Sequence, residues 1–385
     1  MLAFLVLFAP SRAQADDTPP CQTPSLGGYA EVFGTLASET AGDGALPFRG
    51  FDNRANTIAL SNVVLTGQLR CGDATRGWGR VGFDLALQWG LTPNTYYAAE
   101  PSYTAHDGVG ESSATTWRFM QQALVSWRRD TSAAGDRYWQ LEAGVFTSPV
   151  GPEGMAIKDG WNWSRSNLFY GLPFYHAGLR VTRGLGRWRL AAMLLNGWNS
   201  VVDNNDEKTG HLQVVYETDA VVWSAQIMSG VERSSGDPAG RGVWRSLFDT
   251  YLTAHPSAWL SLQAHFDAGV EPGALGTDWW VAGAAYLRLR PWPVSLPGLT
   301  FAVRGDVFYE AVPPGGTPIF WPVAMGARDT LMSSATATVR FEVPHGAIYL
   351  ESRADYSTNQ GIWNPGASHS QNWRETATLG LTAWF

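Results

Sequence analysis

The sequence predicts an all-β protein that folds as a closed antiparallel transmembrane β-barrel of about 16 strands. Three observations predict it: apolar and polar side chains alternate with period two, the alternating segments run about 10–14 residues, and the connections are short and long in turn. Strands of soluble sandwiches are usually nearer 5–6 residues, whereas a tilted membrane strand needs about 9–11. Strand length therefore favours a membrane barrel over a sandwich.

The first fifteen residues have the features of a signal peptide. An apolar run, LAFLVLFAP, precedes the small residues AQA, which fit a cleavage site after Ala15. No Lys or Arg precedes this run, which departs from the usual pattern. We expect residues 16–27 to form a periplasmic N-terminal segment and residues 28–385 to form the barrel. No later apolar run reaches the length of a membrane-spanning helix.

The alternation is clearest in WGRVGFDLALQWGL. Val81, Phe83 and Leu85 would point to one side of a strand, and Arg80 and Asp84 to the other. In a membrane barrel the apolar face contacts lipid and the polar face lines the lumen. The same pattern returns in WLSLQAHFDAGV, FAVRGDVFYE, SATATVRFEV and AIYLESRADY.

The connections set the strand count. The segments 218–220, 255–258 and 344–346 are tight, whereas 38–56, 92–116, 148–173, 312–330 and 359–373 are long. Outer-membrane barrels have short periplasmic turns, long outer loops and an even number of strands. We therefore expect strands that start near residues 28, 57, 78, 116, 137, 173, 187, 209, 221, 244, 259, 278, 299, 331, 346 and 374.

Two further strand features follow from this frame. Trp117 and Trp127 would share one strand face, about 25 Å apart along the membrane normal, so that each lies in an interfacial aromatic girdle. The segment ATLGLTAWF would be the last strand and pair with the first near residues 29–36, because an open edge cannot persist in a membrane. Phe385 would then lie at the periplasmic interface.

Three stretches resemble the bacterial outer-membrane β-barrel porins of the OmpL-like type: RGFDNRANTIALSNVVL, SPVGPEGMAIKDGWNWSRSNLFYGLPFYHAGLR and NGWNSVVDNNDEKTG. The resemblance covers the chain from about Gly27 to Phe385. It implies a barrel in the Gram-negative outer membrane, a passive pore and no cofactor, and it supplies no substrate. The last strand also resembles the terminal signal by which barrel proteins are recognised for assembly, with Phe385 as its final residue.

Strand parity predicts the pore-lining side chains. Their charges are mixed in sign, which favours small polar solutes or ions, although many of them would pair across neighbouring strands. The expected pore-lining residues are Arg80, Asp84, Arg118, Arg180, Asp267, Arg304, Asp306, Arg340, Glu342, Glu351, Arg353 and Asp355.

The long segment 148–173 is the candidate for a loop folded into the pore. It is rich in aromatic residues, which a water-exposed loop would not normally carry. Its charged residues Glu153, Lys158, Asp159 and Arg165 would form the constriction. An external cap or a trimer contact is the alternative for this segment.

The two cysteines are expected to form a disulfide. Cys21 precedes the first strand, and Cys71 lies in the turn after the second, so the topology places both at the periplasmic end. The periplasm is an oxidising compartment. A bond between them would tie the N-terminal segment to the first hairpin.

Other chemistries are disfavoured. The cluster VDNNDEK offers oxygen ligands but no EF-hand spacing, so we expect no metal site. His255 and Ser257 have a lipase-like spacing, but Pro256 between them marks a turn, so we expect no catalytic residue. The formal charge of −7 argues against a nucleic-acid partner.

The function expected from the sequence is an outer-membrane porin for the passive diffusion of small polar solutes or ions. The expected partners are outer-membrane lipid, small solutes, the barrel-assembly machinery and further copies in a homotrimer. The alternative is a plugged barrel that acts as an adhesin or a ligand-binding protein.

Overall fold

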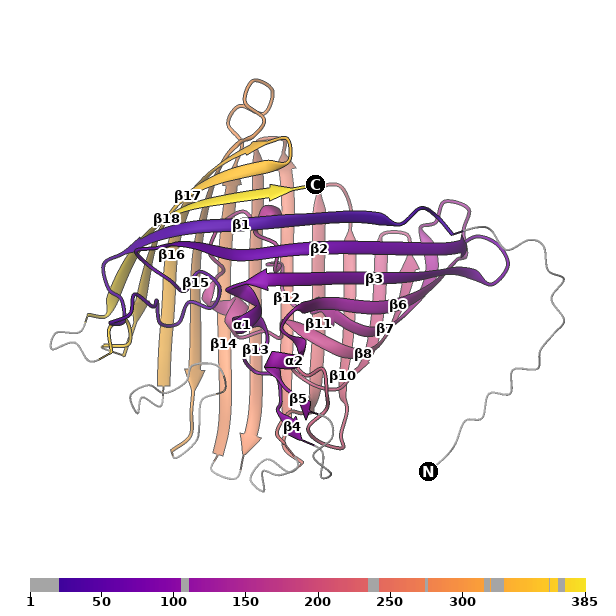
Figure 1. Cartoon of the computed structure of the whole chain (residues 1–385), viewed down its shortest axis with the longest axis horizontal. Coiled ribbons are helices and arrows are strands. Elements are labelled where there is room, and N and C mark those ends of the chain that lie inside the picture. Colours follow the sequence, from indigo (N-terminus) through magenta and orange to yellow (C-terminus); the bar gives the residue numbers. More distant parts are fainter. Residues whose placement is uncertain are drawn as a thin grey trace.

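The structure is a computed structural model that describes residues 21–104, 111–234, 242–273, 276–314, 319, 329–359, 361–365 and 371–385. The predicted signal peptide lies outside these residues. In the described part of the chain, sixteen antiparallel strands close into one barrel, in which each strand pairs with its sequence neighbours and β18 pairs with β1. Figure 1 shows β1–β3 crossing in front of β12–β14 at a large angle, as tilted barrel strands do.

The barrel strands are β1 Ser25–Ala37, β2 Ile58–Asp73, β3 Gly79–Gly90, β6 Met120–Asp130, β7 Arg137–Thr147, β8 Tyr175–Leu185, β9 Trp188–Leu195, β10 Thr209–Glu217, β11 Val221–Val231, β12 Trp244–Ser257, β13 Leu260–Gly273, β14 Gly276–Leu289, β15 Leu299–Ala311, β16 Asp329–Val343, β17 Gly346–Ser357 and β18 Trp373–Trp384. The predicted fold class is thus confirmed. The largest difference in strand start is at β6, which begins at residue 120 and not near 116.

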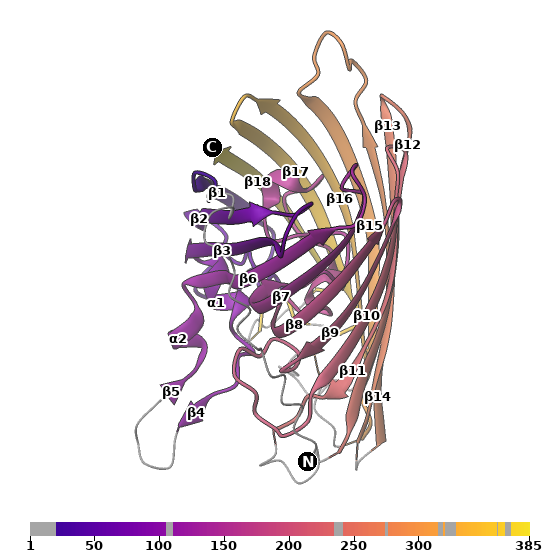
Figure 2. The ribbon, with the colours of Figure 1, turned by 90° about the vertical axis from the view of Figure 1, so that its right-hand side faces the viewer.

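The remaining elements lie in the loops. They are α1 Thr92–Tyr96, the two-stranded pair β4 Tyr103–Thr104 and β5 Glu111–Ser112, α2 Ala114–Trp117, the 3-10 helix η1 Ile157–Asp159 and α3 Asn167–Tyr170. In Figure 2, α1, α2 and the β4–β5 pair lie together on one side, next to β3 and β6. None of the helices in the described residues is long and apolar enough to cross a membrane.

Burial alternates along the strands as the sequence predicts. On β15, Phe301, Val303 and Val307 are exposed on the outer wall, whereas Arg304 and Asp306 are buried on the inner wall. Large exposed apolar side chains recur on the outer face of the other strands. This outer face has the composition that a lipid-facing barrel surface requires.

The last strand pairs with the first strand near residues 29–36, as expected. Tyr29 of β1 lies opposite Trp384 of β18, and Ala37 lies opposite Thr376. Beyond the last paired residue, the N–H of Phe385 donates to the carbonyl of Gly28 at 3.1 Å. The start of the barrel needs a correction, because β1 begins at Ser25 and includes residues that were assigned to the N-terminal segment.

Trp117 is not on a strand, so its predicted place in a lipid-facing girdle is wrong. It ends the helix α2, and its indole Nε1 donates to the hydroxyl of Ser112 at 2.6 Å. The chain is helical here because the backbone N–H of Arg118 closes a helical turn on the carbonyl of Ala114. Trp127 is on β6, as expected.

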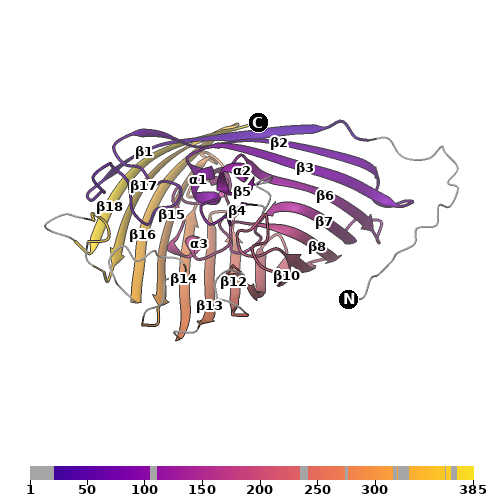
Figure 3. The same ribbon diagram turned by 60° about the horizontal axis from the view of Figure 1, so that its bottom comes forward.

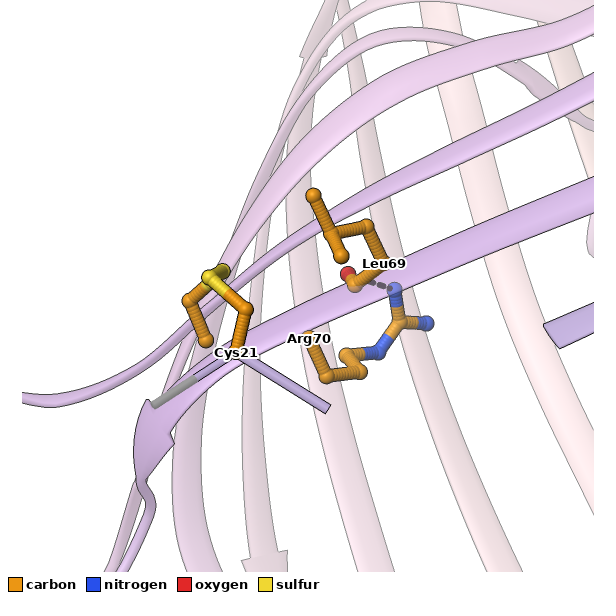
Figure 4. Close-up of a disulfide and its surroundings, with 4 residues drawn as sticks. Cys21, Leu69 and Arg70 are labelled. Atoms are coloured by element: carbon orange, nitrogen blue, oxygen red, sulfur yellow. Dashed lines mark hydrogen bonds between the residues drawn. A yellow bond between two sulfur atoms is a disulfide. The ribbon is translucent and has the colours of Figure 1, made fainter. Parts of the chain in front are cut away.

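Cys21 and Cys71 form a disulfide, which fixes the chain before β1 to the end of β2. The two residues also form an antiparallel β-bridge. Figure 4 shows this bond beside Arg70, whose guanidinium turns back to donate to the carbonyl of Leu69 at 2.9 Å. The described N-terminal segment is therefore anchored to the first hairpin.

Candidate functional site

The segment 148–173, here called the inner segment, lies against the inner wall of the barrel. It joins β7 to β8 and contains η1 and α3. Figure 3 shows α3 within the ring of strands. Its buried residue Leu168 belongs to the same apolar cluster as Trp280 and Phe308 of the wall.

Acidic side chains of the wall accept hydrogen bonds from the backbone N–H groups of the inner segment. Irregular backbone inside a barrel needs such partners, because a buried N–H without an acceptor is costly. The acceptors come from β1, β12, β15 and β17, so they lie far apart around the barrel. The contacts are Glu31 with Ile157 N at 2.7 Å, Asp249 with Gly151 N at 3.3 Å, Asp306 with Asn167 N at 3.0 Å, and Glu351 with Trp163 N at 2.6 Å and Ser164 N at 3.0 Å.

Arginines of the wall bind the backbone carbonyls of the same segment. The guanidinium of Arg304 donates to Ser164 O at 2.5 Å, that of Arg353 to Arg165 O at 2.6 Å, and that of Arg340 to Lys158 O at 2.8 Å. The side chains of Arg304 and Arg353 are fully buried and also pair with Asp306 and Asp355. Because these guanidinium groups are buried, ion-paired and hydrogen-bonded to carbonyls, they hold the inner segment in place.

Asp355 links the wall to an outer loop. It forms ion pairs with Arg353, Arg374 and Arg49, and Arg49 lies in the loop between β1 and β2. Arg49 also pairs with Asp52 of that loop. Burial acts to raise the pKa of Asp52, but the charge and hydrogen bonds of Arg49 outweigh it and lower the pKa. This loop is therefore fixed over the inner wall by charge.

Trp163 is the aromatic anchor of the inner segment. It is fully buried, and its ring centroid lies 5.9 Å from that of Phe33 and 5.5 Å from that of Tyr349. It covers Gly380 of β18, where an added Cβ would lie 2.0 Å from the Trp163 ring. Glycine at this position makes room for the indole on the wall.

A cavity of about 370 Å³ lies on one side of the inner segment. Its wall side is formed by β1, β2, β3 and β6, which contribute Tyr29, Gln68, Asp84 and Gln121, and its inner side includes Glu153 and Asp159. A separate cavity between the inner segment and strands β13 and β14 is only about 60 Å³. The inner segment therefore packs closely against one half of the barrel and leaves open space beside the other half. We call the larger cavity the passage.

Another cavity, of about 760 Å³, lies among the outer loops and is lined by residues such as Phe48, Tyr170, Trp198 and Glu232. Nearby, the buried carboxylate of Glu100 accepts hydrogen bonds from the Tyr175 hydroxyl at 2.5 Å and from Val201 N at 2.9 Å. Burial raises the pKa of Glu100. Glu100 thereby joins the loop after α1 to the loop after β9.

Most of the predicted pore-lining residues do lie on the inward face of their strands. Asp84 pairs with Arg70 at 2.6 Å, Arg180 pairs with Glu142, and Glu342 pairs with Arg340 at 2.8 Å near the strand ends. Neither carboxylate oxygen of Asp267 has a hydrogen-bond partner among the described residues. The predicted residues on inward-facing positions are Arg80, Asp84, Arg180, Asp267, Arg304, Asp306, Arg340, Glu342, Glu351, Arg353 and Asp355. Of these, only Asp84 lines the passage.

Two predicted positions need correction. Arg118 is the C-cap of α2 and lies over the ring of Phe119 at 4.6 Å, so it is not on a strand. Arg165 is buried, and its guanidinium donates to the carbonyls of Gly154 and Met155 within the inner segment. It braces the segment and does not line the passage. Lys158 pairs with Asp159 at 2.8 Å.

The residues considered for catalysis or metal binding make other contacts. His255 Nδ1 lies 2.9 Å from the hydroxyl of Ser261, and the hydroxyl of Ser257 has no partner among the described residues. In the outer loop, Asp203 pairs with Lys208. The described part of the chain contains no group of three or more His, Cys, Asp or Glu residues that could hold a metal ion.

Sequence analysis missed Glu31 and Asp249 as contacts of the inner segment. Both lie on inward positions whose neighbours on the same face are aromatic or apolar, namely Tyr29 and Phe33 on β1 and Leu247 on β12. A simple apolar-polar alternation therefore fails on these strands. A lone acidic residue flanked by inward aromatic or apolar side chains is the signal that would have identified them.

The family model described as "Putative beta-barrel porin-2, OmpL-like" matches residues 24–383. A comparison with curated proteins found no match. Similar solved structures include OmpT of Vibrio cholerae in a trimer form, the outer membrane channel DcaP of Acinetobacter baumannii, and Salmonella typhi OmpF in complex with daunomycin.

The TM-scores are 0.56 for OmpT, 0.55 for DcaP and 0.52 for OmpF, and the sequence identities are 8%, 12% and 10%. The alignments cover 95%, 95% and 94% of this chain and 100%, 98% and 97% of the respective structures. At these identities the likeness establishes the fold alone. The family match spans nearly the whole chain, and the chain therefore belongs to the OmpL-like β-barrel porins of the bacterial outer membrane.

Proposed function

We propose that this outer-membrane channel lets small polar solutes and ions diffuse passively through a lumen of mixed charge, narrowed by the inner segment. The observation that carries the proposal is the passage of about 370 Å³ between the inner segment and the wall of β1, β2, β3 and β6. Its polar lining of Gln68, Asp84 and Gln121 suits hydrated solutes. No cofactor and no catalytic residue takes part.

The fixed position of the inner segment supports a constriction and not a mobile gate. Its backbone N–H groups are bound by Glu31, Asp249, Asp306 and Glu351, and its carbonyls by Arg304 and Arg353. Because the inner segment is bonded to several strands, it stays in one position, and the width of the passage beside it stays constant. Glu153 and Asp159 are the proposed constriction charges, and Lys158 and Arg165 position them.

The test is the conductance of the purified, folded protein in planar lipid bilayers. Stable ion-permeable steps are expected, and they should disappear when the protein is heat-denatured before addition. A folded barrel that inserts but stays silent would refute the proposal.

A silent barrel would favour a second function, which is ligand binding or adhesion by the outer loops of a plugged barrel. The cavity of about 760 Å³ among those loops, with the aromatic residues Phe48, Tyr170 and Trp198 in its lining, is the observation in favour of it. Aromatic faces of this kind bind the apolar faces of ligands.

We also propose that the barrel assembles as a homotrimer in outer-membrane lipid after insertion by the barrel-assembly machinery. The trimer form of OmpT, which shares the fold, supports the oligomer. The exposed apolar residues of the outer wall support the contact with lipid. Light scattering of the protein in detergent, corrected for bound detergent, gives the number of chains.

A further inference from the structure

We propose that the passage selects cations over anions. This inference rests on the proposed function, because it concerns the ions that pass beside the inner segment. It goes beyond a mixed-charge lumen by separating the charges that hold the inner segment from those that a permeating ion meets.

The lining of the passage is acidic. It includes three carboxylates, namely Asp84 from β3 and Glu153 and Asp159 from the inner segment, and the described residues around it contribute no lysine, arginine or histidine. The polar lining residues Thr66, Gln68 and Gln121 are neutral. An ion in this space therefore has carboxylate oxygens as its nearest charged neighbours, and carboxylates favour cations.

The inner-wall arginines of β15, β16 and β17 do not line the passage. The side chains of Arg304 and Arg353 are 0% and 1% exposed, and their N–H groups are used by carbonyls and carboxylates. Arg340 donates to the carbonyls of Lys158 and Gly160. These cations lie behind the inner segment, on the side where it packs against the wall. Their positive charge is neutralised locally by Asp306, Asp355 and Glu342.

The carboxylates of the passage also have cationic partners, but these partners do not line the space. Asp159 is the most accessible of the three, since its side chain is 69% exposed while its partner Lys158 is 28% exposed. Arg70, the partner of Asp84, is held to the wall by the carbonyls of Leu69 and Phe83. Glu153 is paired with the buried Arg304. In the pairs of Asp159 and Glu153 the carboxylate is the more exposed partner. In the pair of Asp84 and Arg70 the arginine side chain is the more exposed, at 24% against 10%, but only Asp84 lines the passage.

The arrangement makes a prediction about charge removal. Neutralising Asp159 removes the most accessible negative charge without breaking a contact between the inner segment and the barrel wall. Neutralising Asp84 leaves Arg70 as an uncompensated cation next to the passage, and neutralising Asp159 does the same to Lys158, so each substitution should reduce the cation preference. A carboxylate far from the passage, such as the exposed Asp136 in the turn between β6 and β7, should have no such effect.

The experiment measures reversal potentials of single channels in a KCl gradient for the wild type, Asp159→Asn, Asp84→Asn and the control Asp136→Asn. The reversal potential of the wild type should have the sign expected when K⁺ permeates more easily than Cl⁻. Asp159→Asn and Asp84→Asn should each shift the reversal potential toward zero, and Asp136→Asn should leave it unchanged.

The outcomes separate the two proposals. A wild-type channel that conducts but is unselective or prefers Cl⁻ overturns the selectivity alone, as does a K⁺ preference that Asp159→Asn and Asp84→Asn leave intact. A folded barrel that never conducts overturns the proposed diffusion function, and the selectivity falls with it.

Discussion

Glu351 of β17 accepts the backbone N–H of Trp163 at 2.6 Å, and its second oxygen accepts the next N–H, that of Ser164, at 3.0 Å. One carboxylate thus binds two consecutive peptide groups at the centre of the inner segment. The hydroxyl of Thr338 donates to the same carboxylate at 2.8 Å and orients it.

Glu351→Gln should loosen the inner segment, because a glutamine side chain has a single acceptor oxygen and no charge. Hydrogen bonds to charged groups contribute about 1.5–3 kcal/mol each, so docking of the segment should weaken by roughly that amount. Single-channel recordings should show more frequent changes of current level than the wild type. Glu375→Gln, at an exposed position of β18, is the control and should record as the wild type does. Equal current stability in Glu351→Gln would contradict a holding role for Glu351.

Gly380→Ala should displace Trp163, since the added Cβ would lie 2.0 Å from its indole ring. Overpacking of this kind typically costs about 1–3 kcal/mol. The free energy of unfolding, measured by urea titration in lipid vesicles, should fall by that amount. Gly305→Ala is a matched control on β15, because an added Cβ there meets no atom within 4 Å. The idea fails if the two substitutions have the same effect.

Stability should depend on the ionisation of Glu100. Its pKa is raised by burial in the folded protein, so the folded state holds this proton more tightly than the unfolded state does. The contribution to stability is fully present below the unfolded pKa of about 4.3 and is lost as the pH rises through the folded pKa. The free energy of unfolding, measured by urea titration at a series of pH values, should therefore fall for the wild type relative to Glu100→Gln as the pH rises through the folded pKa of Glu100. The glutamine variant cannot titrate at this position. A pH-independent difference between the two would rule this out.

Cys71→Ser should destabilise the barrel, because the disulfide closes a loop with a sequence separation of 50 residues. The chain-entropy relation gives about 4 kcal/mol for such a loop. The temperature at which the folded band disappears in gel electrophoresis should be lower for the variant. The reduced wild type is the internal control and should melt with the variant; if reduction has no effect, the bond does not contribute to stability.

Deletion of Phe385 should impair insertion more than export. Phe385 and Gly28 exchange two backbone hydrogen bonds, at 3.1 and 3.3 Å, which extend the closing pair of β1 and β18. The deletion should lower the amount in outer-membrane fractions while periplasmic protein accumulates. Phe385→Ala keeps the backbone bonds and removes the ring, so it separates strand closure from recognition of the aromatic side chain. Normal outer-membrane levels of the deletion would count against both roles.

Sequence analysis predicted the barrel well because its rules are local. Period-two alternation and connection length depend on neighbouring residues alone, and they identified the sixteen strands and the facing of Arg304 and Glu351. The helix α2, which removed Trp117 and Arg118 from a strand, lies where the alternation ends. In this stretch the alternation gave no indication that the chain turns into a helix.

The arrangement within the lumen was harder to predict because it depends on contacts between distant residues. Parity places Arg304 and Asp84 equally on the inner wall, but the inner segment covers Arg304 and leaves Asp84 beside open space. Likewise, nothing near Arg165 in sequence indicates that its guanidinium turns back to Gly154 and Met155. Which charge faces the open space is decided by the side on which the segment packs.

The bonds of the inner segment to Glu31, Asp249, Asp306 and Glu351 join strands on different sides of the barrel through its interior. The segment thus connects opposite parts of the barrel wall through the interior. Flattening the barrel along the line from β1 to β12 would strain these bonds in addition to the bonds between the strands. We therefore expect the width of the passage to change little with membrane tension or with the thickness of the surrounding lipid.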